Sequence, residues 1–190
     1  YQEEERMQEK YLEFKLGAPD YVTVETEEER LVCQGGSSAV TAGSTTVEFE
    51  DAGEHEDIFV TSEDAVKCVK LRWNYKIPKS FGDAWERTYG DMEWHGMSGN
   101  RYLPWYFLAK LSEKILCFGV KVRPSAMCYW QADTKGITLF LDVRCGNAGV
   151  QLKGRKLRAA QIVCMESQNA GSFETAQEFC RRMCTDPIFP

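Results

Sequence analysis

Alternation of apolar and polar residues with a period of two is the feature that most limits what this chain can fold into. In "VKLRWNYK", residues 69–76, every second residue is apolar and the residues between them carry basic or amide side chains. Successive side chains of a strand point to opposite faces, so the pattern predicts a strand with one buried and one wet face. No parallel βαβ alternation is visible along the 190 residues.

Several other segments have the same character, and turn residues separate them. The turn sequence "DTKG" (133–136) predicts one hairpin, and Lys153-Gly154 predicts a turn between a further pair of strands. Many short strands joined by turns are typical of an antiparallel β-sandwich. "QGGSSAVTAGS" (34–44) is interpreted as a flexible connection. The predicted strand segments are "KYLEFKLG" (10–17), "YVTVETE" (21–27), "STTVEFE" (44–50), "DIFVTS" (57–62), "KILCFGVKV" (114–122), "SAMCYWQAD" (125–133), "GITLFLDVRCG" (136–146) and "GVQLKGRKLRAAQIVCMES" (149–167).

One α-helix is expected near the C-terminal end of the chain. "GSFETAQEFCRRMC" (171–184) has Ser172 as an expected N-cap and an apolar stripe from Phe173 to Met183 at helical spacing. The predicted class is therefore mainly β, an antiparallel sandwich with one C-terminal helix. The predicted divisions are a charged extension (1–10), a sandwich domain (11–171), and a helix with a linker (172–190).

Charge is distributed unevenly between the two parts of the chain. Residues 1–64 contain 18 acidic and 4 basic residues, a net charge of −14, and residues 65–190 contain 11 and 19, a net charge of +8, which together give −6. A basic run such as "KGRKLR" (153–158) can contact nucleic acid. Here basic residues alternate with apolar ones, as on the wet face of a strand, so we expect no nucleic-acid partner.

Eight cysteines and two histidines give no pattern of metal ligands. CxxC pairs are absent, which argues against zinc, and no metal or cofactor is expected. Cys117, Cys128, Cys145 and Cys164 lie in apolar, strand-like runs and are interpreted as buried, reduced side chains, with disulfides as the alternative. There is no run of 18 apolar residues and no apolar signal core at the N-terminus, so the expected location is the cytoplasm, without a membrane contact.

The stretch "YGDMEWHGMSGNRYLPWYF" (89–107) carries the candidate chemistry. Asp91 and Glu93 are two residues apart and would face the same side of a strand, where a carboxylate pair could perform acid–base chemistry on a sugar. The alternative is that both carboxylates are solvated or paired with Arg87 and Arg101. No P-loop, dinucleotide fingerprint, nucleophile elbow or HExxH motif is present.

Aromatic residues and a histidine in the same stretch could contact a sugar ring. Trp94 and Trp105 offer flat apolar faces, with core packing as the alternative, and Trp105 is expected to be buried because it opens an apolar run. His95 beside Gly96 suggests a loop site, with a structural role as the alternative. The residues chosen for sugar contact or docking are Asp91, Trp94 and His95, and the part from Arg101 onward is interpreted as core strand.

Three collinear segments point to a known family. "YGDMEWHG…NRYLPWYFLA", "GVKVRPSAMCYWQAD…GITLFLDVRCGNAGVQLKGRKLRAAQIV" and "FCRRMCTDPIFP" together resemble the N-terminal region of bacterial α-galactosidase-like glycoside hydrolases. These enzymes form families twenty-seven and thirty-six, the melibiase group. The resemblance covers roughly residues 85–190.

The resemblance implies a supersandwich-like domain that precedes a catalytic (β/α)₈ barrel of ~250 residues. Both catalytic aspartates of the family belong to that barrel, so no catalytic residue is assigned here. The implied partners are the barrel of the same protein and a carbohydrate; self-association is compatible with the sequence. The implied parent is a glycosidase, and this chain alone is expected to be inactive. The alternative is a free-standing carbohydrate-binding or protein-interaction sandwich.

Overall fold

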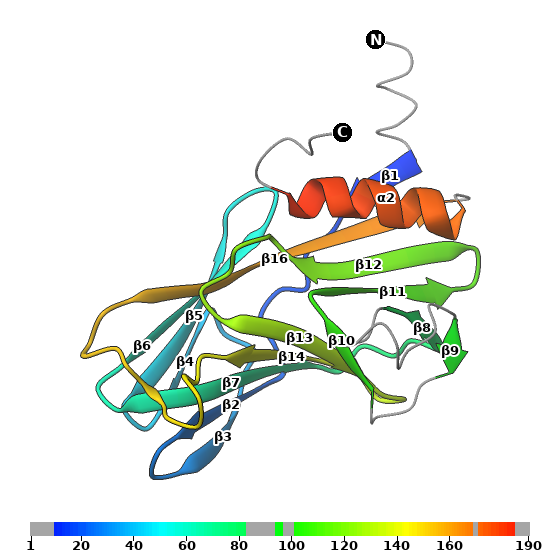
Figure 1. Ribbon diagram of the computed structural model, residues 1–190. Coiled ribbons are helices and arrows are strands. Elements are labelled where there is room, and N and C mark those ends of the chain that lie inside the picture. Colours follow the sequence, from blue (N-terminus) through cyan, green and yellow to red (C-terminus); the bar gives the residue numbers. More distant parts are fainter. Residues whose placement is uncertain (1–9, 83–93, 97–100, 169–170, 185–190) are drawn as a thin grey trace.

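The computed structural model describes residues 10–82, 94–96, 101–168 and 171–184. These residues form two antiparallel sheets, of nine and seven strands, packed as a sandwich with one helix near the C-terminal end (Figure 1). The predicted fold class is therefore confirmed. Within the described ranges no helix has the length and apolar character that a membrane span requires.

The nine-stranded sheet is organised around its last strand, β16. Along one edge β16 pairs with β12. Along its other edge the first part of β16 pairs with β6 and its last part pairs with β1. Along the sheet the order is β4-β5-β6-β16-β12-β11-β8-β9. The bounds are β1 Tyr11–Glu13, β4 Ala39–Ala42, β5 Thr45–Asp51, β6 Glu56–Ser62, β8 Lys79–Phe81, β9 His95–Gly96, β11 Tyr106–Leu111, β12 Lys114–Val120 and β16 Leu157–Gln168.

The seven-stranded sheet has β7 and β14 at its centre. Its order is β10-β13-β14-β7-β2-β3, and β15 pairs with one end of β7. Asp133 makes the β13–β14 hairpin turn as the sequence predicts, because its N–H donates to the carbonyl of Gly136 (2.9 Å). The bounds are β2 Tyr21–Thr26, β3 Arg30–Gln34, β7 Ala65–Trp73, β10 Tyr102–Pro104, β13 Met127–Ala132, β14 Ile137–Asp142 and β15 Val150–Gln151.

The main core lies between the two sheets and is rich in aromatic rings. Phe107 and Phe118 of the nine-stranded sheet stack with centroids 4.9 Å apart, and Trp130 of the other sheet meets Phe107 edge-on at 5.6 Å. Trp73 and Trp130 are both buried, as the alternation of their strands predicts. Fully burying such side chains contributes about 1.5–3 kcal/mol each, so this cluster fixes how the sheets meet.

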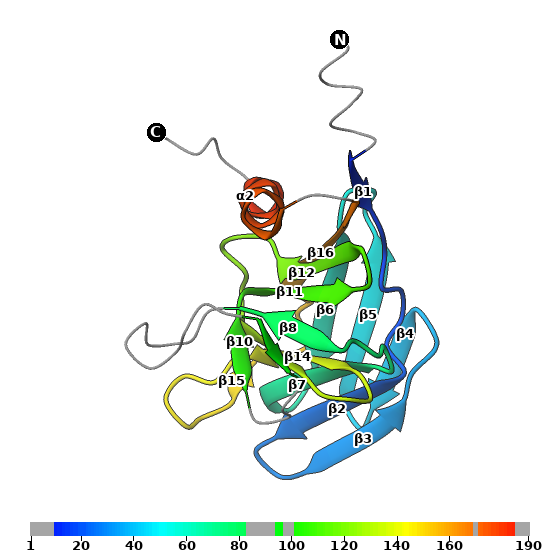
Figure 2. The ribbon, with the colours of Figure 1, turned by 90° about the vertical axis from the view of Figure 1, so that its right-hand side faces the viewer.

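Helix α2 (Ser172–Met183) covers the outer face of the nine-stranded sheet, as the end-on view in Figure 2 shows. Phe179 and Met183 pack there with Leu108, Cys117 and other residues of a second core cluster. A side chain at Gly119 of β12 would meet the sulfur of Met183 at 2.7 Å and the ring of Phe179 at 2.8 Å. The bare backbone of Gly119 therefore allows the helix to lie this close to the sheet.

Two details of the helix differ from the sequence prediction. The N-cap is Gly171, without a side-chain cap, and Ser172 is already helical. Phe173 is 79% exposed rather than part of the buried stripe, whose buried members are Thr175, Phe179 and Met183. The face that carries Thr175 lies toward β16, where the Thr175 hydroxyl donates a hydrogen bond to the Ser167 hydroxyl (3.0 Å).

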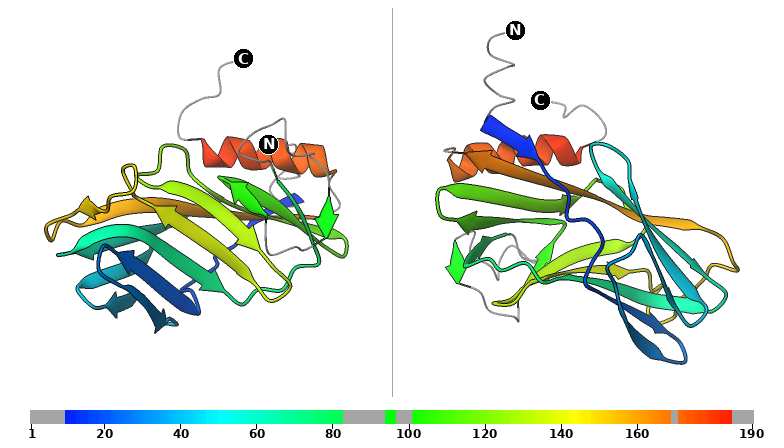
Figure 3. Two further views of the ribbon diagram at one scale, coloured as in Figure 1. Left: turned by 60° about the horizontal axis from the view of Figure 1, so that its bottom comes forward. Right: turned by 180° about the vertical axis from the view of Figure 1, so that it is seen from behind.

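Strand β1 runs beside the helix (Figure 3) and leads into a turn that is hydrogen-bonded to Glu56 of one sheet and to Trp73 of the other. Lys10 pairs with Glu174 at one end of the helix (3.0 Å), and Glu13 pairs with Arg182 near the other (3.3 Å). After β1 the chain turns at Gly17, which has a φ of 70°. This segment therefore connects the helix side of the molecule with the space between the sheets.

Three strand predictions are corrected. Residues 39–42 of the expected flexible connection form β4, and residues 30–34 form β3, which the prediction omitted. The turn at Lys153-Gly154 exists, but β15 and β16 do not pair with each other: β15 joins the seven-stranded sheet and β16 the nine-stranded one. Alternation predicts a strand's two faces but carries no information about which sheet receives it.

Candidate functional site

Two of the three predicted site residues lie at the edge of the nine-stranded sheet, and Asp91 lies outside the described residues, as does Glu93. Trp94 precedes β9, and its ring lies 5.6 Å from that of Phe81, at the margin of the cluster beneath α2. His95 is in β9 and pairs with Ser80 of β8. Trp94 and His95 are both partly exposed.

A second aromatic group lies on the outer face of the seven-stranded sheet. We call Tyr102, Tyr129 and Phe140 the aromatic face. Tyr129 and Phe140 are cross-strand partners whose rings stack with centroids 4.7 Å apart, and Tyr102 meets both edge-on at 5.4 and 5.8 Å. Such pairs contribute about 0.5–1.5 kcal/mol beyond area burial, so the rings hold one another in a fixed arrangement.

Charged groups surround the aromatic face. The Lys70 ammonium lies 5.2 Å from the Phe140 ring centroid. Arg72 donates two hydrogen bonds to the Asp133 carboxylate (2.7 and 2.8 Å), which lower the pKa of Asp133 to about 2. Burial raises the pKa of the Tyr129 phenol to about 12, so this group is a neutral donor and acceptor at pH 7. The face thus combines apolar rings with fixed polar groups at its margin.

Trp105 marks the place where the chain crosses from one sheet to the other. It lies between β10 and β11, is 42% exposed, and has a φ of 65°. Three hydrogen bonds hold its backbone: its N–H donates to Cys128, and its carbonyl accepts from the Val120 N–H and the Trp130 indole. The left-handed region is costly for a bulky residue, and strain of this kind concentrates at functional sites.

The prediction that Trp105 is buried is therefore wrong. The part from Arg101 onward is also not one continuous strand, because β10 and β11 belong to different sheets. Burial resumes at Phe107, on the far side of the crossover. At Trp105 the chain passes from one sheet to the other, so its backbone belongs to neither sheet. The side chain of Trp105 lies at the surface.

Further apolar side chains are exposed close to this crossover. Met127 is 52% exposed and directly precedes Cys128, which Trp105 contacts through its N–H. Val122 follows Val120 by two residues and is also exposed. We call Tyr102, Trp105, Val122 and Met127 the crossover edge. Exposed apolar groups gathered in one region are typical of a surface that another molecule covers.

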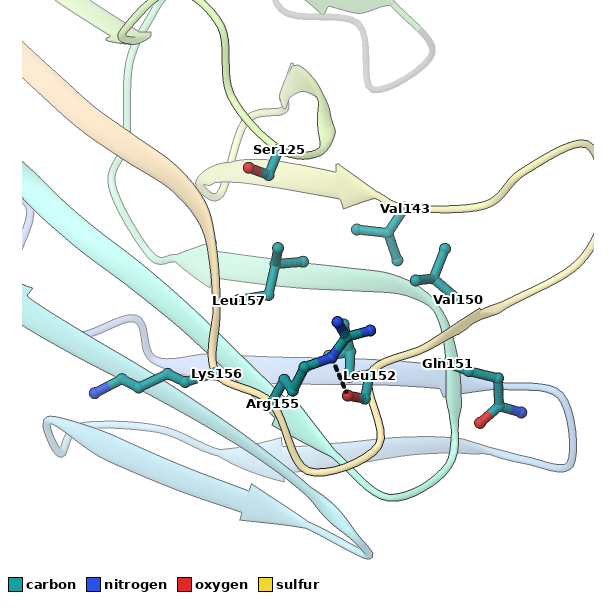
Figure 4. A pocket seen from close by; sticks show the side chains of 8 residues that line it. All are labelled: Ser125, Val143, Val150, Gln151, Leu152, Arg155, Lys156 and Leu157. Atoms are coloured by element: carbon teal, nitrogen blue, oxygen red, sulfur yellow. Dashed lines mark hydrogen bonds between the residues drawn. The ribbon is translucent and has the colours of Figure 1, made fainter.

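A pocket lies at the end of the sandwich where the chain passes from β15 to β16 (Figure 4). Its volume is about 350 Å³. Val143, Val150, Leu152 and Leu157 supply apolar walls, and the Arg155 guanidinium points into the space between them. Ser125 lies at the opposite side, whereas Lys156 and Gln151 point away from the centre.

Three buried cysteines are poor candidates for nucleophilic or ligand chemistry. All eight are free. Burial raises the pKa of the Cys128 thiol to about 12 and raises those of Cys117 and Cys164 as well, so these thiols stay protonated. Cys145 is exposed, contrary to prediction, because β14 ends at Asp142. The part of the chain that the structure describes contains no group of three or more His, Cys, Asp or Glu residues placed to hold a metal ion.

Comparison with known proteins assigns no family to this chain, because no family model and no curated protein matches it.

The sequence analysis missed both the aromatic face and the pocket. The signal for the face was present, since Tyr129 and Phe140 occupy the wet-face positions of predicted strands, where polar residues are usual. Three aromatics at such positions could have been singled out. Their assembly depends on strand pairing, which the alternation does not reveal.

Proposed function

We propose that this chain is a non-catalytic N-terminal β-sandwich domain of an α-galactosidase-like glycoside hydrolase. In this proposal the domain packs on a catalytic (β/α)₈ barrel of the same protein and shapes its sugar pocket. The proposal combines the resemblance of residues 85–190 to the melibiase group with the sandwich architecture. The observation that carries it is the crossover edge, with Trp105 at its centre.

The crossover edge suits a protein partner. The centres of protein interfaces are enriched in Trp, Tyr and Met, and a few such anchors supply most of the binding energy. Trp105 and Met127 are both exposed, and the Trp105 N–H donates to the carbonyl of Cys128, the residue that follows Met127. Trp105 is also held in a costly backbone conformation. The change of layer accounts for the backbone conformation of Trp105, and a partner that covers the crossover edge accounts for the exposure of its side chain.

The test begins with the natural reading frame. Its intact product is expected to exceed ~450 residues, the size of a sandwich plus a barrel, and to hydrolyse an aryl α-galactoside, whereas the 190-residue chain does not. In that product Trp105→Ala should weaken domain packing and lower the thermal midpoint. Val32→Ala, at an exposed apolar position in β3, is the matched control. A natural product that ends near Pro190 contradicts the proposal.

The aromatic face favours a second function, a free-standing carbohydrate-binding sandwich. Sugar rings stack on aromatic side chains, and their hydroxyls need donors and acceptors such as the Tyr102 and Tyr129 phenols. Under this alternative the 190-residue chain binds oligosaccharides, and Tyr102→Ala abolishes the binding while Trp105→Ala leaves it unchanged. Under the first proposal Trp105→Ala weakens domain packing in the full-length protein, and the 190-residue chain has no oligosaccharide binding for Tyr102→Ala to remove.

A further inference from the structure

The pocket at the end of the sandwich has one cation whose position is set by the turn before it. Lys153 and Gly154 both have left-handed backbones, with φ values of 53° and 73°, as a tight hairpin-type turn requires. The Arg155 N–H closes the turn on the Leu152 carbonyl at 3.1 Å, and Gly154 donates to the Ser62 carbonyl at 3.0 Å. The turn is thus tied to the end of β6.

The Arg155 side chain is fixed by the same acceptor. Its Nε donates to the Leu152 carbonyl at 3.1 Å, which leaves Nη1 and Nη2 at the free end of the guanidinium. Figure 4 shows this end directed between Val143, Val150 and Leu157. A guanidinium offers two parallel donors to an oxyanion, and one that is already oriented loses little freedom when it binds.

The charge of the pocket comes from Arg155. Among the described residues no carboxylate forms an ion pair with Arg155, although Glu63 approaches the turn at Gly154. Lys156 is occupied elsewhere, because its ammonium pairs with Glu48 (3.4 Å) and Glu50 (3.2 Å) and points away from the pocket. The pocket therefore combines apolar walls with one positively charged group, the Arg155 guanidinium, that points into the space between them.

We propose that this pocket binds a small monocarboxylate with an apolar body. The carboxylate accepts two hydrogen bonds from Nη1 and Nη2 of Arg155, and its body lies against Val143, Val150 and Leu157. Ser125 closes the opposite side with a hydroxyl. A monoanion matches the single guanidinium, whereas a phosphate dianion would retain an uncompensated charge against apolar walls and would have no apolar body to bury. This inference does not rest on the proposed function.

The test uses benzoate as the probe and the intact 190-residue chain, with binding followed by chemical shifts of backbone amides. At drug-fragment efficiencies a ligand of this size is expected to bind with a Kd of about 1 mM. The largest shifts should occur at Leu152 to Leu157. Benzamide, which has the same shape without the charge, and inorganic phosphate, which lacks the apolar body, should each bind at least about tenfold more weakly.

Two neighbouring variants separate the site from general surface charge. Arg155→Met keeps an apolar stem at an exposed position and should weaken benzoate binding at least about tenfold. Lys156→Met removes the adjacent cation, which points away, and should leave the Kd unchanged within about twofold. Equal loss in both variants, equal binding of benzamide, tighter binding of phosphate, or no shifts at the turn would each overturn the proposal.

Discussion

Glu56 and Trp73 hold the same turn from opposite sheets. The buried Glu56 carboxylate, on β6, accepts the Leu16 N–H at 2.9 Å, and the Trp73 indole, on β7, donates to the Gly17 carbonyl at 3.0 Å. Residues 16 and 17 thus form a polar connection between two layers that otherwise meet through apolar side chains. A buried carboxylate is costly unless it is hydrogen-bonded, so Glu56 and the turn depend on each other.

Removal of the Glu56 carboxylate should therefore destabilise the sandwich. In Glu56→Ala the Leu16 N–H loses its acceptor inside the protein, and the free energy of unfolding should fall by about 1–3 kcal/mol. Urea unfolding measures this change. Glu54→Ala, at an exposed position two residues away, should change the free energy by less than about 0.5 kcal/mol. Equal effects of the two substitutions would contradict the role given to Glu56.

The Arg72–Asp133 pair should make part of the stability dependent on pH. The pKa of Asp133 is lowered from 3.8 to about 2 in the folded protein, chiefly by its hydrogen bonds from Arg72. A depressed carboxyl pKa stabilises the fold above pH ~4, and this contribution is lost as the pH falls toward 2. Because the pair is partly exposed, we expect only about 1 kcal/mol at pH 7.

Comparison of the wild type with Asp133→Asn tests this contribution. The difference in the free energy of unfolding should be about 1 kcal/mol at pH 7 and should shrink toward zero at pH 2. Denaturant titrations at several pH values give the difference directly. A difference that stays constant down to pH 2 would show that the asparagine acts through the turn and not through the charge.

Gly119→Ala should displace helix α2. The added methyl group would overlap Met183 and Phe179, and overpacking of this kind typically costs about 1–3 kcal/mol. Amide hydrogen exchange should accelerate selectively in residues 172–183. Gly96→Ala is the control, because a Cβ at that position meets nothing within 4 Å. Unchanged exchange in the helix would mean that its contact with β12 is looser than the structure shows.

Because the backbone of Trp105 is strained, we expect glycine at this position to give a more stable protein than alanine, the reverse of the usual order. At a φ of 65°, glycine is unstrained whereas alanine is not, so Trp105→Gly should be more stable than Trp105→Ala by about 1 kcal/mol. At Leu111, an exposed apolar position within β11, the order should be the usual one, with alanine the more stable. Thermal unfolding of the four variants checks both orders.

Thiol reactivity should follow burial. Cys145 is exposed and should react first with a disulfide reagent at pH 8, whereas Cys117, Cys128 and Cys164 should react only as fast as the protein opens. Mass spectrometry of labelled peptides identifies the sites. Early labelling of Cys128 would indicate that β13 is less protected than its burial implies.

Strand identity and core residues were largely accessible from the sequence, because alternation reports which face of a strand is buried. Trp73, Trp130 and the apolar residues of β12 lie in the core as predicted. Sheet membership was not accessible: β15 and β16 flank a turn that has hairpin residues, yet they separate into different sheets. The cross-strand pairing decides this, and the residues that pair are far apart in the chain.

The candidate site was harder to predict than the fold. Trp94 and His95 are adjacent in sequence, so a local pattern was enough to select them as candidates, and their role in sugar contact stays a prediction. The aromatic face joins residues from β10, β13 and β14, and the pocket needs residues from both sheets. Trp105 was misjudged because the apolar run that follows it is buried, while its own position is fixed by a change of layer.

The position of β16 in the nine-stranded sheet has a consequence for biosynthesis. Because β16 lies between β6 and β12, the two halves of that sheet remain separate until residue 168 has left the ribosome. Until then a nascent chain carries two unpaired strand edges, which invite association with other chains. The two halves of this sheet can therefore join only after β16 has been synthesised, and we expect chaperones that shield strand edges to be most effective before that point.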